Sequence, residues 1–209
     1  MYSGYTSSKI DSLEIFQSKL LHWADQFSTF CYLDSNQCAD RYGRFDFLIG
    51  VDALEHYTME DLEDIYREIF LMGYFGYISD SSIPYSFNEF IPFEKSYFFR
   101  PRYIIYGYEG RVYFNRNYSE MMEIVSQIES ITVTFPKNTA PLQFQHITTQ
   151  EEYLNNVKTI QHKIRKGYFY QLNYCIELQA ENVLLHPIAS YIQTNKETKA
   201  PMSALLKMG

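Results

Sequence analysis

The sequence predicts an α+β fold in which antiparallel sheets pack together and helices lie on the outside. Three observations support this prediction. Hydrophobic residues make up 46% of the 209-residue chain, which is enough for a substantial core. Aromatic residues make up 18% and are mostly Tyr and Phe, which favour strands. Between residues 148 and 178, a helical pattern, a glycine and an alternating strand pattern also follow one another directly.

Helices and strands are both expected in the first hundred residues. Apolar residues at three- and four-residue spacing predict two helices, and short aromatic runs predict the strands between them. The first helix is expected over 10–27, with Ser7 or Ser8 as its cap, and strands are expected over 27–33 and 42–51. The second helix should be opened by Thr58 and Asp61 and ended by Gly73, and a strand over 74–79 should follow. Residues 80–95 predict a long irregular loop.

A hairpin and a linker are expected in the middle of the chain. Glu109-Gly110 lies between two alternating runs, 102–108 and 111–115, and this pattern is typical of a tight hairpin turn. A helix over 118–128 and a strand over 131–135 should follow. Two prolines mark a linker, so we divide the chain into residues 1–136, a linker over 137–147, and residues 148–209.

The stretch from Thr148 to Leu178 gives the clearest local prediction. Thr149 and Glu152 form a capping box, in which each side chain binds an unpaired amide at the start of a helix. Gly167 is suited to end that helix, because glycine adopts the left-handed backbone conformation easily. Residues 168–178 then alternate in the pattern of a long strand. A short helix over 187–194 and an apolar turn or strand over 201–208 should follow.

Charge and cysteine content exclude several classes of protein. A net charge of −7 and a pI of about 5.2 provide no basic surface for nucleic acid or for an anionic membrane. Cys31, Cys38 and Cys175 are odd in number and have no metal-binding spacing, which favours a reducing, cytoplasmic environment. The N-terminus does not have the pattern of a secretory signal, and no apolar run approaches the length of a membrane span.

A family resemblance begins at the glycine that ends the predicted helix. Residues 167–173, Gly-Tyr-Phe-Tyr-Gln-Leu-Asn, resemble the start of the chorismate-binding domain of chorismate-utilising synthases. They are most similar to component I of aminodeoxychorismate synthase, the para-aminobenzoate branch of that family. Its sister enzyme, anthranilate synthase, usually has Phe-Gln-Val-Val at this point. The alternative interpretation is that Gln171 and Asn173 only form the solvated face of an edge strand.

Four further segments resemble the family in the expected order. They are Tyr32-Leu33-Asp34-Ser35, Gly73-Tyr74-Phe75-Gly76-Tyr77 with Asp80, Phe98-Phe99-Arg100-Pro101, and Ala200-Pro201-Met202-Ser203-Ala204-Leu205-Leu206. Several landmarks in one order are more specific than any single motif. The resemblance therefore implies an anthranilate-synthase-like fold in which residues 1–136 form the N-terminal domain and residues 148–209 form an incomplete chorismate-binding domain.

The resemblance also implies a ligand pocket. In members of the family that bind tryptophan, the pocket uses the segments that match Leu33, Asp34, Ser35, Pro201, Met202 and Ser203. A carboxylate and a hydroxyl can bind an ammonium group, while apolar walls hold an indole. The chain departs from the family here, because Asp34 replaces a Glu and Met202 replaces a Tyr. The alternative interpretation is that Asp34-Ser35 forms only an Asx-type turn.

The implied parent protein aminates chorismate to 4-amino-4-deoxychorismate for folate synthesis. The resemblance implies ammonia from a glutamine amidotransferase subunit and Mg²⁺ as the cofactor. The catalytic and metal-binding segments of the family match nothing in this chain, so we expect the 209 residues to be inactive with chorismate. The alternatives are anthranilate synthase component I, a non-catalytic ligand-binding module, and an unrelated interaction domain.

Overall fold

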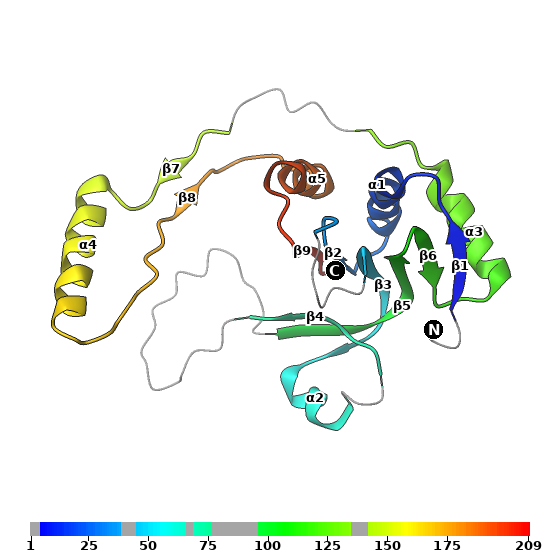
Figure 1. The fold of residues 1–209 in the computed structure, drawn as a ribbon, viewed down its shortest axis with the longest axis horizontal. Coiled ribbons are helices and arrows are strands. Elements are labelled where there is room, and N and C mark those ends of the chain that lie inside the picture. Colours follow the sequence, from blue (N-terminus) through cyan, green and yellow to red (C-terminus); the bar gives the residue numbers. More distant parts are fainter. Residues whose placement is uncertain (1–4, 39–44, 66–68, 77–95, 135–141) are drawn as a thin grey trace. The chain divides into compact units, whose positions relative to one another are not determined.

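The computed structural model describes residues 5–38, 45–65, 69–76, 96–134 and 142–209, and these form two compact units (Figure 1). Unit 1 comprises Met1–Phe135 and Pro187–Gly209, and unit 2 comprises Pro136–His186. The expected loop over 80–95 with Asp80, the start of the strand expected from residue 42, and residues 137–141 of the expected linker lie outside the described residues.

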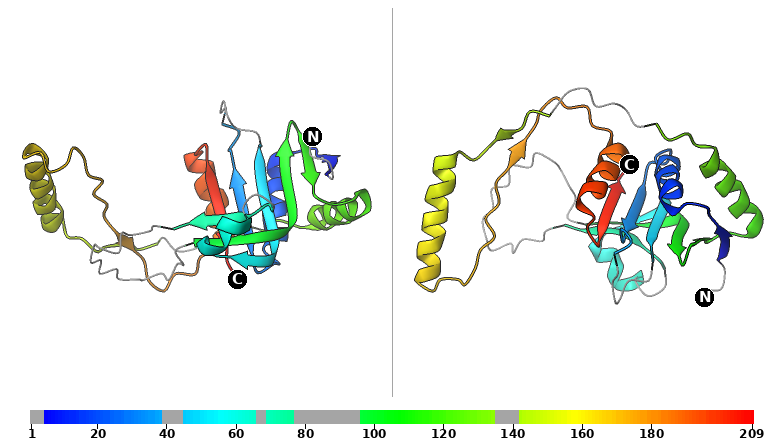
Figure 2. Two further views of the ribbon diagram at one scale, coloured as in Figure 1. Left: turned by 90° about the horizontal axis from the view of Figure 1, so that it is seen from below. Right: turned by 45° about the horizontal axis from the view of Figure 1, so that its top comes forward.

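Unit 1 is built on an antiparallel sheet. Its described residues form seven strands in the order β1-β6-β5-β3-β2-β9, with β4 paired to β5 (Figures 1 and 2). The strands are β1 (Thr6–Lys9), β2 (Phe30–Asp34), β3 (Phe47–Tyr57), β4 (Met72–Phe75), β5 (Ser96–Tyr108), β6 (Arg111–Phe114) and β9 (Ser203–Lys207). Each of these pairings is antiparallel. The predicted α+β class is therefore confirmed.

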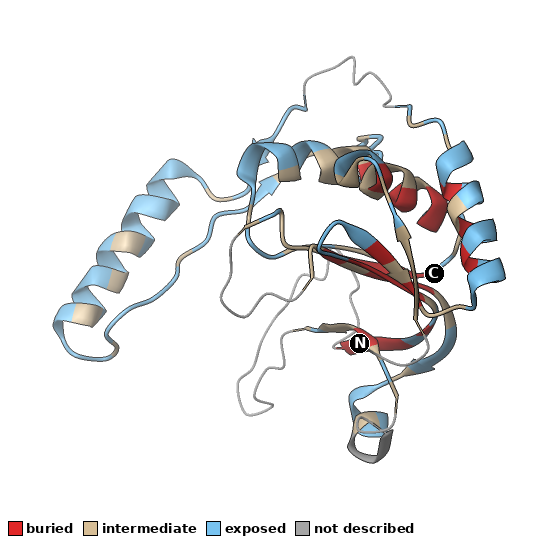
Figure 3. Ribbon diagram, turned by 45° about the vertical axis from the view of Figure 1, so that its right-hand side comes forward, coloured by how far each residue is buried: buried red, intermediate tan, exposed pale blue. Residues whose placement is uncertain are grey.

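Three helices of unit 1 pack on one face of this sheet. They are α1 (Leu13–Ala24), α3 (Tyr118–Ser130) and α5 (Pro187–Thr198), and all three contribute to the main hydrophobic core. Figure 3 shows that the outer faces of α1 and α3 are exposed while the sides toward the sheet are buried. A fourth helix, α2 (Met59–Ile65), follows Thr58, whose backbone N–H donates to the Asp61 side chain, as the sequence predicts.

Residue alternation along the strands separates the two faces of the sheet. Phe30 and Tyr32 of β2 lie in the main core under the helices, whereas Cys31 between them lies in a smaller cluster with Met72 and Phe99. This two-residue period is the reason that a short run such as residues 30–32 can supply side chains to both faces. The main core therefore fixes the positions of the strands and helices that surround the candidate site.

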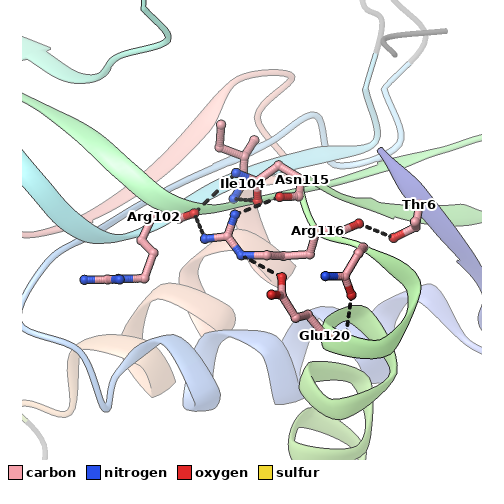
Figure 4. Close-up of polar contacts among 7 residues, drawn as sticks. Thr6, Arg102, Ile104, Asn115, Arg116 and Glu120 are labelled. Carbon is pink, nitrogen blue, oxygen red and sulfur yellow. Dashed lines mark hydrogen bonds and ion pairs between the residues drawn. The ribbon is translucent and has the colours of Figure 1, made fainter. Parts of the chain in front are cut away.

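The hairpin between β5 and β6 forms as the sequence predicts. Glu109 and Gly110 have φ values of 50° and 71°, the combination that a type I′ turn requires. Beyond β6, Arg116 fixes the entry to α3, as Figure 4 shows. Its guanidinium donates to the carbonyl oxygens of Asn115 and Arg102 and pairs with Glu120 at 3.6 Å.

Several element boundaries differ from the prediction. The first helix begins at Leu13 after Ser12, because Ser7 and Ser8 lie in β1, where they pair with β6. Gly73 does not end a helix but lies inside β4, against the backbone of β5. The strand expected over 131–135 is also wrong for its described part, since residues 131–134 have no strand partner after α3 ends.

Unit 2 contains the helix with the clearest sequence signal. In α4 (Gln150–Arg165), Thr149 and Glu152 form the predicted capping box. Gly167 has a φ of 79°. The backbone N–H groups of Gly167 and Tyr168 donate hydrogen bonds to the carbonyl oxygens of Ile164 and Lys163, which is the Schellman pattern. The apolar face of α4 has no buried residue.

The long strand expected over 168–178 is mostly wrong. Within it, only Leu178 belongs to a strand, since β8 (Leu178–Gln179) pairs with β7 (Gln145–His146). A strand requires a neighbour to accept and donate its backbone hydrogen bonds. Among the described residues, only β7 provides this neighbour. Tyr174 instead stacks on Tyr153 of α4, with ring centres 5.5 Å apart.

The two compact units do not follow the division at residues 136 and 147. Unit 2 begins at Pro136, but the chain returns to unit 1 at Pro187 because β9 pairs with β2 along its whole length. The family domains that we infer from the resemblance, 1–136 and 148–209, stay a prediction. No described helix is both long and apolar enough to cross a membrane.

Candidate functional site

The candidate site is a cavity of about 400 Å³ in unit 1. Helices α1 and α5, the end of β2 and the turn after β2 supply its walls. The lining residues are Glu14, Gln17, Ser18, Leu21, Tyr32, Asp34, Asn36, Gln37, Tyr191, Ile192, Asn195, Lys196 and Lys199. This volume lies within the usual range of small-molecule sites. Most of the lining side chains are polar or charged, so the cavity is suited to a ligand with polar groups.

Asp34 is the carboxylate at the end of β2, and three neutral groups donate hydrogen bonds to it. The Tyr32 hydroxyl and the Gln17 side-chain amide bind Oδ2 at 3.0 and 3.2 Å. The backbone N–H of Asn36 binds Oδ1 at 2.8 Å, which is the Asx-turn geometry anticipated as an alternative interpretation. Asp34 therefore forms the turn and also lines the cavity.

The electrostatic environment of Asp34 disfavours its negative charge. Burial raises the pKa of this carboxyl, and the hydrogen bonds from Asn36, Tyr32 and Gln17 only partly oppose that effect. Because the folded-state pKa lies above the unfolded value, the contribution of Asp34 to stability is complete below the unfolded pKa and is lost as pH rises through the folded pKa. A bound cation would favour the charged form.

Two tyrosines form the aromatic part of the cavity wall. The rings of Tyr32 and Tyr191 meet edge to face, with centres 5.9 Å apart and planes at 88°. Burial raises the pKa of Tyr32 well above its usual value and raises the pKa of Tyr191 to about 12. Both hydroxyls therefore stay protonated near neutral pH. Tyr191 shares a 2.8 Å hydrogen bond with Ser203 at the start of β9.

Asn36 joins the turn after β2 to the segment that contains α5 and β9. Its side-chain amide lies within hydrogen-bonding distance of Asn195 Oδ1 at 2.8 Å, the carbonyl oxygen of Ala200 at 2.5 Å and Ser203 Oγ at 3.3 Å. Asn195 donates back to Asn36 Oδ1. A single asparagine therefore connects parts of the chain that are 159 to 167 residues apart.

Replacing Asn36 with glycine should weaken this connection. The φ of Asn36 is 51°, which glycine adopts without strain, so the substitution removes the side chain and leaves the turn possible. We expect the free energy of unfolding to fall by about 1–3 kcal/mol, because acceptors in α5 and β9 lose their donor. Urea denaturation measures this change.

Gln37→Gly is the matched control for Asn36→Gly. Gln37 also has a positive φ, 55°, and its exposed side chain makes no recorded hydrogen bond within the described chain. Both substitutions add the same backbone entropy to the unfolded chain. The difference between the two losses in the free energy of unfolding therefore gives the contribution of the Asn36 side-chain amide. Equal losses of stability in the two variants would show that the amide contacts do not hold the segment.

The structure brings part of the expected pocket together. Asp34 and Ser203 are partners in the β2–β9 register, and Leu33 lies opposite Ala204. Of the six expected residues, Asp34 lines the cavity, whereas the side chains of Leu33 and Met202 are 40% and 81% exposed. Ser35 donates to the carbonyl oxygen of Asp46 at 2.9 Å and so ties β2 to β3. Whether these residues bind tryptophan stays a prediction.

The sequence analysis did not identify several of the residues that line the cavity. Gln17, Tyr191, Asn195, Lys196 and Lys199 come from two helices that are far apart in the chain. Their helical pattern indicates which residues share a face, but not that the two helices meet at one cavity. Asn36 had a weak signal, because asparagine is enriched at positions with positive φ.

The described residues do not fit the magnesium site that the resemblance implies. Within those ranges, no group of three or more His, Cys, Asp or Glu residues could hold a metal ion. Magnesium in proteins takes oxygen ligands, usually one or two carboxylates with water and substrate oxygens.

Comparison with known proteins places the chain in a family. A search of curated proteins finds no match. A family model described as chorismate binding enzyme matches residues 20–209. This match includes all of unit 2, unit 1 from residue 20 onward, and the lining residues of the cavity except Glu14, Gln17 and Ser18. The chain belongs to the chorismate binding enzyme family, whose members are chorismate-utilising enzymes.

Proposed function

We propose that the chain is the N-terminal part of component I of an aminodeoxychorismate synthase. Such a protein converts chorismate and ammonia to 4-amino-4-deoxychorismate on the route to para-aminobenzoate and folate. The observation that carries the proposal is the motif Gly167 to Asn173, which lies inside the matched family region and follows a helix with both predicted end signals. Family membership supports chorismate as the substrate.

The nearest alternative is component I of anthranilate synthase, which also eliminates pyruvate from chorismate. Tyr170-Gln171-Leu172-Asn173 favours the aminodeoxychorismate branch, since the sister enzyme usually has Phe-Gln-Val-Val there. A non-catalytic ligand-binding module is a second alternative, favoured by the cavity in unit 1. These three functions make different predictions for the product that forms from chorismate.

The proposal includes a partner, a cofactor and a compartment. A glutamine amidotransferase subunit would supply ammonia, and Mg²⁺ would bind ligands outside the described residues. The carboxylate of Asp34 supports the amino-acid pocket that the resemblance implies, with tryptophan as its expected ligand. The three free cysteines favour the cytoplasm.

The test begins with the intact mass of the native gene product. We expect a product about twice the length of this chain or more, in keeping with a single enzyme that has a complete catalytic domain. That product is then incubated with chorismate, magnesium and ammonia. Formation of 4-amino-4-deoxychorismate supports the proposal, and formation of fluorescent anthranilate supports the alternative. A native product that ends at Gly209 and binds a ligand without turnover would leave only the binding module.

The isolated 209-residue chain provides the corresponding negative control. We expect no turnover of chorismate by this chain with magnesium and ammonia, because the catalytic segments of the family match nothing within it. Measured turnover by the purified chain would contradict this expectation. Glutamine-dependent activity of the native product after addition of an amidotransferase subunit would support the proposed partner.

A further inference from the structure

Unit 2 contains an extended segment whose backbone lacks a recorded neighbour. Residues 168–177 alternate in the pattern of a strand, yet the strand β8 begins only at Leu178, where it pairs with β7. Among the described residues, no hydrogen bond between backbone groups is recorded for residues 169–176. An extended segment of this kind presents a row of N–H and C=O groups that another strand can bind.

One face of this segment is apolar and lies beside α4 (Figure 1). The ring of Tyr174 stacks on Tyr153 of the helix, and its hydroxyl accepts a hydrogen bond from Asn156 at 2.7 Å. The other large side chains of the same alternating set are exposed, and they are Tyr168, Tyr170, Leu172, Ile176 and Leu178. The helix has no buried residue either, as its blue and tan colours in Figure 3 show. Helix and segment therefore form one apolar surface, the α4 surface, which the described residues leave largely exposed.

The α4 surface is large enough to form an interface. Tyr170 is 100% exposed and Tyr168 is 73% exposed, and an aromatic side chain has about 150–250 Å² of surface. These two side chains alone therefore expose about 300 Å², which reaches the size of the largest apolar patch on a typical monomer. The exposed aliphatic side chains of the segment and of α4 bring the surface toward the ~800 Å² that each partner gives to a stable interface. A surface of this kind marks a site where another protein binds.

The charges at the two ends of the α4 surface favour a second copy that runs in the opposite direction. Glu177 is the only charged residue in 168–178 and lies near the end of the segment. A basic cluster of Lys163, Arg165 and Lys166 lies directly before its start. Helix α4 has the same polarity, with acidic residues in its first turn and basic residues in its last turn. Antiparallel copies bring the acidic end of each near the basic end of the other, whereas parallel copies would bring like charges together.

We propose that the α4 surface binds a second copy of the chain, and that the two extended segments pair as antiparallel strands about Leu172. The surface is complementary to itself, as the interface of a two-fold dimer must be. The inference does not depend on the proposed reaction. It assigns to the alternating pattern of 168–177 the neighbouring strand that this run lacks in the described chain.

The register follows from the position of the unpaired run, because residues 168–176 are centred on Leu172. With Leu172 opposite the same residue of the second copy, Tyr170 lies opposite Tyr174 and Tyr168 lies opposite Ile176. Such aromatic–aromatic and aromatic–β-branched pairs stabilise antiparallel sheets. The apolar sets of both copies then share one face of the sheet, on the side of the two α4 helices. Glu177 of each copy lies near Lys166 of the other.

The first experiment is sedimentation equilibrium of the 209-residue chain. We expect the dimer to predominate at about 100 µM, since interfaces of ~1,600 Å² in total bind with micromolar affinity or more tightly. The fitted dissociation constant is the reference for the variants below. A chain that stays monomeric at this concentration would overturn the proposal.

Disulfide formation tests the register. In a Cys38→Ser/Cys175→Ser background, Leu172→Cys places two thiols opposite each other, within the ~7 Å between Cα atoms that a disulfide allows. We expect most of this variant to become a covalent dimer under mild oxidation. Tyr170→Cys is the matched control, because its two copies lie four residues apart along the strands, about 13 Å, which is too far for a disulfide. Equal cross-linking of the two variants, or none of Leu172→Cys, would refute the paired strands.

Charge reversal tests the antiparallel direction. Glu177→Lys should raise the dissociation constant about fivefold, because each new ammonium group lies near Lys166 of the other copy and the dimer contains this contact twice. Adding Lys166→Glu should restore the original value. Glu181→Lys is the matched control, since it makes the same change of charge at an exposed residue outside the segment. An unchanged dissociation constant for Glu177→Lys, or no rescue by the second substitution, would contradict the antiparallel arrangement.

The native gene product distinguishes a second copy from other occupants of the α4 surface. If that product is monomeric at about 100 µM while amide exchange over 168–176 is slow, other residues of the same chain cover the surface and the proposal is wrong. A native dimer that Leu172→Cys cross-links supports the proposal, whichever product forms from chorismate. Failure of this inference and failure of the proposed function are therefore seen in separate measurements.

Discussion

Replacing Gly73 with alanine should separate β4 from β5 and lower the free energy of unfolding by about 3 kcal/mol or more. A Cβ atom at this position would lie 1.8 Å from the carbonyl oxygen of Tyr97 and 2.8 Å from Cα of Phe98. Both atoms belong to the backbone of β5, so no side-chain rotation can relieve the overlap. The φ of Gly73 is 156°, a backbone conformation that residues with a side chain rarely adopt. Urea denaturation followed by circular dichroism measures the loss.

Gly110→Ala is the matched control for this prediction. Gly110 also has a positive φ, 71°, but a Cβ atom there would meet nothing within 4 Å. We expect it to cost only about 1–2 kcal/mol, the strain of a left-handed backbone with a side chain. A Gly73→Ala variant that is no less stable than Gly110→Ala would show that β4 does not approach β5 as described.

Replacing Phe47 with alanine should have the second large effect. Phe47 is 1% exposed and packs on Tyr32 and Phe16, with ring centres 6.0 and 6.4 Å away. Its ring also packs closely on Gly107, because a Cβ atom added to Gly107 would lie only 2.5 Å from the nearest carbon of the Phe47 ring. Truncation of a buried Phe leaves a cavity and costs about 3–5 kcal/mol. Because Tyr32 forms part of the cavity wall, ligand binding should weaken as well.

Phe75→Ala is the control that separates burial from residue type. Phe75 lies at the end of β4, is 60% exposed and makes one recorded ring contact, with Phe98 at 4.7 Å. We expect its loss to cost less than about 1.5 kcal/mol, the upper value for one aromatic pair. Similar losses for the two variants would mean that Phe47 is not at the centre of the core.

Local signals in the sequence predicted the parts of the fold that depend on local interactions. The capping box at Thr149, the left-handed Gly167 and the turn at Glu109-Gly110 each involve groups within a few residues of one another. Such groups interact in the same way whatever the rest of the chain does. This is why the ends of α4 and the β5–β6 hairpin were predicted correctly.

Long-range pairing explains the errors. Ser7 and Ser8 lie in a strand because β6, more than a hundred residues later, is their neighbour. Residues 168–177 have a strong alternating pattern but no ladder partner in the described chain. An alternating pattern indicates which side chains share a face of a strand, but it does not identify the neighbouring strand.

The sequence identified only some of the residues that line the candidate site. The segments of Asp34 and Ser203 were expected together because of the family resemblance, and the β2–β9 register places these two residues opposite each other. Gln17, Tyr191 and the two lysines entered the site only through the packing of α1 and α5 around β2. No local pattern in the sequence encodes this meeting of helices.

The pairing of β9 with β2 has a consequence for the order of folding. Asp34 and Ser203 are 169 residues apart in sequence, so this ladder has an unusually long loop to close. Since the ribosome releases the chain from its N-terminus, β2 emerges long before its partner and keeps an open edge during synthesis. High contact order slows folding, so we expect the docking of β9 to be a late step. Thr29 and Ser35 bond to Asp52 and Asp46 on the β3 side. The alternating residues Phe30, Tyr32 and Asp34 therefore carry the backbone groups that stay open to wrong pairing in the nascent chain until β9 docks.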